Sequence, residues 1–150
     1  MEIEYVSGWF EFADRDLASA EYLCGMRPCP LEIICYHCQQ AAEKYLKGYL
    51  ISFGVMEPPK THNLDDLCEL CSDIDEHFRE ISGACNTLTV YGVQPRYPNE
   101  MEITENDMQN ALNYARQIKD FAPLQATRQE QVQATGEKET LPAEKAPDTD

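Results

Sequence analysis

No apolar run in this 150-residue sequence reaches the ~18 residues that a membrane-spanning helix needs. The first residues also lack a basic patch followed by an apolar segment, so the sequence predicts no secretory signal peptide. The odd count of seven cysteines argues against a framework of disulfides. We therefore expect a soluble, cytoplasmic protein with mostly reduced thiols and no membrane contact.

Basic residues are scarce. The chain has 12 lysines and arginines against 27 aspartates and glutamates, which gives a net charge of −15. Residues 1–121 alone carry 21 acidic and 9 basic residues, so the acidity is not confined to the C-terminal part. Such a charge disfavours indiscriminate binding to nucleic acids or anionic membranes. A nucleotide or RNA ligand would therefore need a local basic patch.

Segments in which polar and apolar residues alternate, as in half-buried strands, are also missing. Apolar residues recur instead at spacings of three and four, in segments separated by proline and glycine. The apolar face of residues 33–53 is too wide for a surface helix, which indicates a central helix packed by several neighbours. The sequence predicts an all-α, up-and-down antiparallel bundle. Its five helices are expected near residues 9–24, 33–53, 64–74, 78–91 and 104–121.

The composition changes after Phe121. Residues 122–150 contain no aromatic residue and only three large aliphatic ones. Such a segment cannot bury enough apolar surface to offset the entropy of ordering it. We therefore expect a bundle over residues 1–121 and a disordered acidic tail over residues 122–150.

Polar residues follow one edge of the central helix. His37, Gln40, Lys44 and Lys47 fall within a stripe about 80° wide on a helix of 100° per residue. Their imidazole and ammonium groups could donate hydrogen bonds to a phosphate, and the Gln40 amide could contact a base or a ribose. The stripe predicts a ligand site. The alternative is structural: the two lysines pair with Glu43 or other surface acids, and His37 and His62 are buried and hydrogen-bonded, which locks helices together.

Three residues outside the central helix could complete such a site. Thr61 and His62 lie where the third helix begins, and the free amides and dipole of a helix N-terminus favour anions. Arg96 lies in a loop between prolines, where a guanidinium could hold a phosphate bidentately or clamp the structure. We predict ligand binding by this set, with no assigned catalytic residue, no metal and no cofactor: His37, Gln40, Lys44, Lys47, Thr61, His62 and Arg96.

Two Cys-x-x-Cys pairs have the spacing of zinc ligands. Cys35 and Cys38 lie in the central helix, and Cys68 and Cys71 lie in the third. Zinc ligands with this spacing usually lie on a tight knuckle, whereas both pairs follow the apolar face of a helix. We expect all four thiols to pack in the core, where free cysteine behaves as a small hydrophobic residue.

Four segments of the chain follow the motifs of a known family. Residues 35–48, read as CYHCQQAAEKYLKG, resemble the signature helix of the HEPN domain family (higher eukaryotes and prokaryotes nucleotide-binding). Three further segments match its other motifs: Thr61-His62 before Leu64, Arg96-Tyr97-Pro98, and the Ala-x-x-Asp-Leu-x-x-Ala pattern from Ala13 to Ala20. The resemblance covers roughly residues 8–121 and implies a helical bundle that commonly forms a homodimer.

The resemblance implies several functions. Many HEPN domains are metal-independent ribonucleases whose motif is an arginine followed, after four to six residues, by a histidine. None of the six arginines in this chain is followed by a histidine at that spacing. Other members are encoded beside minimal nucleotidyltransferases in toxin–antitoxin-like modules. We expect a nucleotide-binding or partner-binding component of such a module. The alternatives are a ribonuclease with unusual residues, such as His62 as base with Arg96, and a dimeric adaptor without catalysis.

Overall fold

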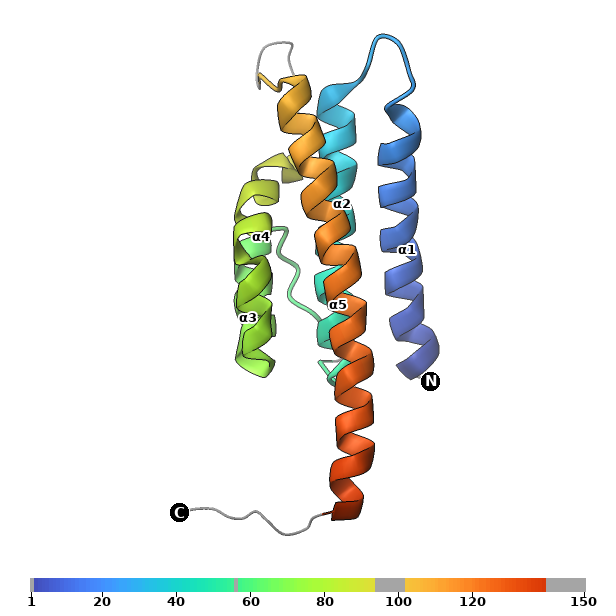
Figure 1. The fold of residues 1–150 in the computed structure, drawn as a ribbon, viewed down its shortest axis with the longest axis vertical. Helices are drawn as coiled ribbons and strands as arrows, with labels where there is room; N and C mark the ends of the chain where they lie inside the picture. Colours follow the sequence, from blue (N-terminus) through green and yellow to red (C-terminus); the bar gives the residue numbers. More distant parts are fainter. Residues whose placement is uncertain (1, 56, 94–101, 140–150) are drawn as a thin grey trace.

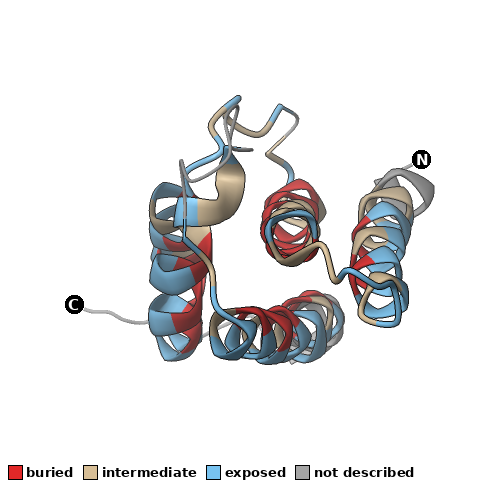
Figure 2. Cartoon of the chain, turned by 90° about the horizontal axis from the view of Figure 1, so that it is seen from above, coloured by how far each residue is buried: buried red, intermediate tan, exposed pale blue. Residues whose placement is uncertain are grey.

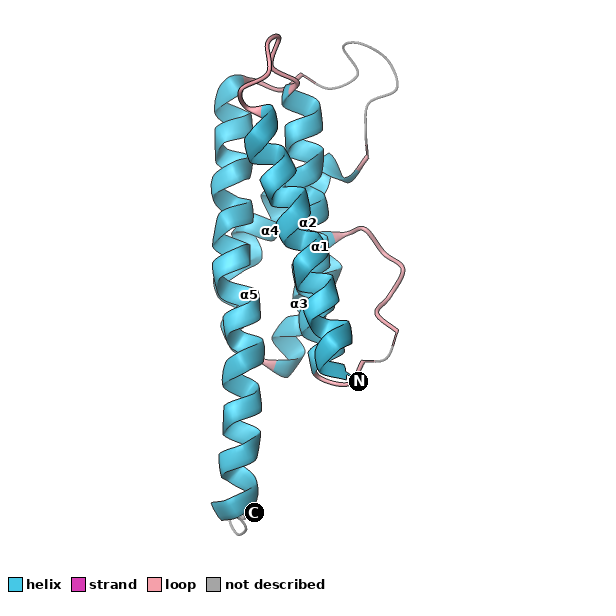
Figure 3. Cartoon of the chain, turned by 90° about the vertical axis from the view of Figure 1, so that its right-hand side faces the viewer, coloured by secondary structure: helices cyan, strands magenta, loops and turns pink. Residues whose placement is uncertain are grey.

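The computed structural model describes residues 2–55, 57–93 and 102–139. These residues form helices and loops and no strand (Figure 3), so the all-α prediction is confirmed. The helices are α1 Glu2–Leu23, α2 Leu31–Ser52, α3 Leu64–Ile74, α4 Ser82–Leu88 and α5 Glu105–Glu139, with short 3₁₀ helices η1 Glu76–Ile81 and η2 Thr89–Gly92.

Helix α2 is the centre of the bundle. It lies between α1 on one side and the α3–α4 pair on the other, with α5 packed across it (Figure 1). The buried faces of all the helices turn toward this centre when the bundle is viewed from above (Figure 2). Tyr45, Leu46 and Tyr49 of α2 are fully buried, and the Tyr49 ring lies 4.3 Å from that of Phe78. The wide apolar face predicted for the central helix is therefore in contact with neighbours on several sides.

Helix α3 runs in the same direction as α2, which departs from strict up-and-down alternation. Gln39, in the first half of α2, bonds the carbonyl of His62 just before α3, and Cys71, late in α3, bonds the carbonyl of Leu46. Both chains of contacts therefore follow α2 and α3 in the same direction, as the ribbon shows (Figure 1). The connection between the helices, residues 53–63, is long enough for this return, because an extended chain spans about 3.3 Å per residue. As a result, the start of α3 lies against the middle of α2 and not beyond its end.

Side chains at the helix ends explain where the elements begin and stop. Asn63 caps α3 by accepting a hydrogen bond from the Asp66 amide at 3.1 Å. Thr104 and Asp107 form a capping box before α5, each side chain accepting from the other's amide at 3.0 Å. Gly54, just after α2, has φ +88°, a conformation that other residues rarely adopt.

The structure differs from the prediction at the end of the last helix. Helix α5 continues past Phe121 to Glu139 and contains Pro123. Ala122, Gln125 and Ala126 are buried, so this part of α5 still contributes to the core. The composition of the segment did not indicate a buried helix, because a packed segment is expected to contain large aliphatic side chains. Here the buried side chains are small ones and an amide. Residues 140–150, the rest of the predicted tail, lie outside the described residues.

Candidate functional site

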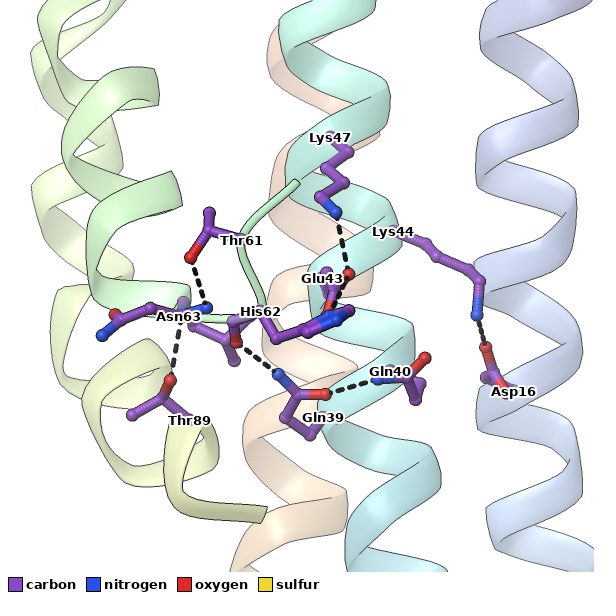
Figure 4. A network of polar contacts seen from close by, with 11 residues as sticks. Asp16, Gln39, Gln40, Glu43, Lys44, Lys47, Thr61, His62, Asn63 and Thr89 are labelled. Atoms are coloured by element: carbon purple, nitrogen blue, oxygen red, sulfur yellow. Dashed lines mark hydrogen bonds and ion pairs between the residues drawn. The ribbon is translucent and has the colours of Figure 1, made fainter. Parts of the chain in front are cut away.

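The polar stripe of α2 divides between two neighbouring elements. Lys44 reaches toward α1, whereas Lys47 folds back along α2 toward the start of α3 (Figure 4). His37 also faces α1, and Gln40 contacts Gln39 on the α3 side. The predicted residues therefore form two separate clusters, one on each side of α2, and not one continuous pocket.

On the α1 side, the carboxylate of Asp16 holds two residues of the stripe. His37 Nδ1 lies 3.0 Å from Asp16 Oδ1, and Lys44 Nζ lies 2.5 Å from Asp16 Oδ2. All three side chains are partly accessible, with exposed fractions of 29% for His37, 16% for Asp16 and 26% for Lys44. We call these three residues the Asp16 cluster. Its ion pairs join α1 to α2.

On the α3 side, the carboxylate of Glu43 holds Lys47 and His62. Lys47 Nζ donates to Glu43 Oε2 at 2.9 Å, and His62 Nδ1 lies 3.0 and 3.1 Å from the two Glu43 oxygens. The exposed fractions are 8% for Glu43 and 9% for Lys47 but 71% for His62. We call these residues the Glu43 cluster. It contains a buried ion pair and an imidazole that faces solvent.

A chain of hydrogen bonds holds the backbone next to the Glu43 cluster. Gln40 Nε2 donates to Gln39 Oε1 at 2.8 Å, and Gln39 Nε2 donates to the carbonyl of His62 at 2.9 Å (Figure 4). Gln39 is fully buried, so its amide is fixed in place. Thr61 contributes only locally, because its hydroxyl accepts from the Asn63 amide at 3.0 Å. Gln40 and Thr61 therefore support the position of His62.

Arg96, the seventh predicted site residue, lies outside the described residues together with the rest of the Arg-Tyr-Pro segment. The ligand-binding role of the set stays a prediction. Asp16 and Gln39 were not predicted, whereas Glu43 was expected only in the structural alternative, as a partner of the lysines. For Glu43 the available signal was its spacing of four residues before Lys47, which places the two side chains together on a helix.

The Cys-x-x-Cys pairs lie inside helices, as expected from the sequence. Cys35, Cys38, Cys68 and Cys71 are all buried. Burial raises the pKa of the Cys35 thiol to about 12, and it also raises the pKa of Cys38 and Cys71. In the described part of the chain, no three His, Cys, Asp or Glu residues are placed to hold a metal ion together.

Two open hollows lie along α1. One, of about 510 Å³, is lined by Ala18, Ser19, Tyr22, Leu23 and His37, and borders the Asp16 cluster. The other, of about 490 Å³, lies between α1 and α5 and includes none of the predicted site residues.

Among the described helices, none combines the length and hydropathy that crossing a bilayer requires.

Comparison with known proteins identifies the family of the chain. The family model of the HEPN domain matches residues 6–125. The crystal structure of ST0689, an archaeal HEPN homologue, is similar with a TM-score of 0.61 at 25% identity, covering 81% of this chain and 97% of that one. The crystal structure of TT1696 from Thermus thermophilus has a TM-score of 0.65 at 26% identity, covering 79% and 95%. A search of curated protein sequences finds no match.

Proposed function

The chain belongs to the HEPN domain family, and from this we propose that it is the binding component of a two-component, toxin–antitoxin-like module with a minimal nucleotidyltransferase. The observation that carries the proposal is the neutralisation of the α2 stripe. Lys44 and Lys47 are each bonded to a carboxylate of the same chain. A cation that is already paired offers less to a nucleotide phosphate, which favours a protein partner over a free nucleotide as the ligand.

Charge and sequence support a role without the family's usual nuclease chemistry. The 150 residues contain no arginine followed after four to six residues by a histidine, and they carry a net charge of −15. A polyanion such as RNA is repelled by that charge unless a basic patch compensates. Both observations favour a chain that acts through a bound protein.

Co-expression tests this proposal. The chain with an affinity tag is expressed together with a minimal nucleotidyltransferase and, as the control, with an unrelated acidic protein. We expect a stable complex with the transferase only, measured by size-exclusion chromatography with light scattering.

Calorimetry with ATP and GTP then tests the nucleotide alternative. Tight nucleotide binding without complex formation would replace the partner-binding proposal. The same chromatography on the isolated chain tests the homodimer expected for the family.

A second candidate function, ribonuclease activity with unusual residues, is favoured by one observation. His62 is the most exposed of the three described histidines, and its Nδ1 is held by a buried carboxylate. An imidazole in this arrangement can act as a general base. Incubation with cellular RNA tests this candidate. Cleavage that persists in a His62→Ala variant would remove it.

A further inference from the structure

The three side chains of the Glu43 cluster differ widely in burial. Glu43 and Lys47 are almost fully buried, while His62, the third member, keeps 71% of its side chain exposed. Burying an ion pair is costly, and such pairs are weak evidence for stability alone. Here the buried pair, together with the bond from Gln39 to the His62 carbonyl, fixes both the backbone and the ring of a residue that faces solvent. Supports of this kind are typical of a side chain whose exact position matters.

The hydrogen bond to Glu43 determines which nitrogen of His62 carries the proton. Lys47 Nζ donates to Glu43 Oε2 at 2.9 Å, so the two side chains form an ion pair. An ionised carboxylate can only accept hydrogen bonds, so Nδ1 of His62 must be the donor. In the neutral imidazole, Nε2 then carries the lone pair. This lone pair belongs to the exposed side of the ring.

The other two histidines give a useful contrast, because each also lies against a carboxylate through Nδ1. His77 lies 2.8 Å from Asp75, but the two residues are only two positions apart, and Asp75 also caps η1 by accepting from the His77 amide. That contact is explained by the local turn. His37 is 29% exposed and shares Asp16 with Lys44 in a contact between helices. Of the three described histidines, His62 alone joins a distant, buried carboxylate to a largely exposed ring.

We propose that Glu43 and His62 form a general-base pair in which Nε2 of His62 takes the proton from a hydroxyl group or a water molecule. The O–H bond breaks, its electron pair stays on the oxygen, and the proton moves to Nε2. Glu43 then lies beside an imidazolium and stabilises its positive charge, while the other side of its carboxylate stays paired with Lys47. His62 is the group that touches the substrate, and Glu43 is a positioning residue. The ligand class is a hydroxyl compound or water next to an electrophile, and the inference does not depend on the partner-binding role.

The first experiment measures base chemistry with p-nitrophenyl acetate as the probe, on the full chain at neutral pH. We expect His62→Ala to lower the protein-dependent rate of nitrophenolate release at least about tenfold, since a positioned base contributes this much or more. Glu43→Gln should lower it similarly. His77→Ala, the matched control on the locally paired histidine, should leave it unchanged. An unchanged rate in His62→Ala, or an equal loss in His77→Ala, would overturn the proposal.

The second experiment reads the tautomer directly and needs no activity. Nitrogen-15 NMR of the histidine rings should show Nε2 of His62 unprotonated in the wild type at neutral pH, and a changed tautomer mixture in Glu43→Gln. If Glu43→Gln does not fold, the double variant Glu43→Gln, Lys47→Met removes both buried charges and takes its place. A proton on Nε2 of neutral His62 in the wild type would rule out the base.

Discussion

The two sides of α2 carry the same three kinds of residue, an acid, a lysine and a histidine, in opposite arrangements. In the Asp16 cluster all three side chains are partly exposed, and the contacts join two helices. In the Glu43 cluster the acid and the lysine are buried, and the histidine is exposed. The same chemistry thus serves as a clamp between helices on one side and as a support for a solvent-facing imidazole on the other. The burial of the carboxylate makes the difference, because it sets both the strength of the electrostatics and the freedom of the ring.

The largest difference between the two sides should be seen when each carboxylate is removed. Glu43→Ala leaves Lys47 buried without its partner, which should lower the free energy of unfolding by about 3–5 kcal/mol. Asp16→Ala affects more exposed groups and should cost only about 1 kcal/mol. Urea denaturation followed by circular dichroism measures both. Equal losses would show that burial does not distinguish the two clusters.

Substitutions at Gly48 and Gly92 compare how tightly the two sides of α2 are packed. A Cβ on Gly48 would lie 2.6 Å from Cε1 of Phe10 and 3.2 Å from Cβ of Trp9, on the α1 side. Gly48→Ala should therefore destabilise the fold by about 1–3 kcal/mol, although alanine favours helix. A Cβ on Gly92 would lie 3.1 Å from Nε2 of Gln39, a side-chain end on the α3 side.

Gly92→Ala should cost less than Gly48→Ala, because the added Cβ would lie 3.1 Å from its nearest neighbour at Gly92 but only 2.6 Å from it at Gly48. Thermal unfolding of the two variants ranks them. The reverse order would mean that the α3 side, and not the α1 side, is the tighter interface of α2.

Alkaline pH should lower the stability of the whole fold. Burial raises the pKa of Cys35 from 9.0 to about 12, and burial also raises the pKa of Tyr91 to about 12. In the unfolded chain these groups lose their protons at lower pH than in the folded chain, so the unfolded state binds fewer protons above about pH 9. Stability from these groups is complete below about pH 9 and decreases toward about pH 12. Melting temperatures between about pH 8 and 11 should fall steadily, and a flat profile would contradict the burial of these groups.

The smallest effects should come from the exposed ion pairs between α1 and α5. Arg116 bonds Glu21 at 2.9 Å and Lys119 bonds Asp14 at 3.1 Å, with every side chain close to half exposed. Pairs of this kind contribute about 0.2–1 kcal/mol and are screened by salt. Arg116→Ala and Lys119→Ala should each change the free energy of unfolding by less than about 1 kcal/mol. A larger loss that persists at high salt would point to packing and not to charge.

Much of the fold could be predicted because it depends on short-range patterns. The spacing of Tyr45, Leu46 and Tyr49 predicts a wide buried face, and the Thr104–Asp107 pair predicts a helix start, since both depend only on helix geometry. The end of α5 was missed for a physical reason. Ala122 and Ala126 fill the core through their small size, and composition alone does not distinguish a small buried residue from one in a solvated tail.

The sequence by itself determined the all-α class, the HEPN resemblance, the absence of the usual nuclease pair and the stripe on α2, because each is a property of residue type and spacing along one helix or motif. Only the tertiary structure decided that Lys44 turns to Asp16 while His62 reaches Glu43. Those contacts join residues 28 and 19 positions apart. The first depends on how α1 packs against α2, and the second depends on α3 running alongside α2 in the same direction. Helical periodicity gives the direction of a side chain from its own helix axis; it does not give the partner that meets it there.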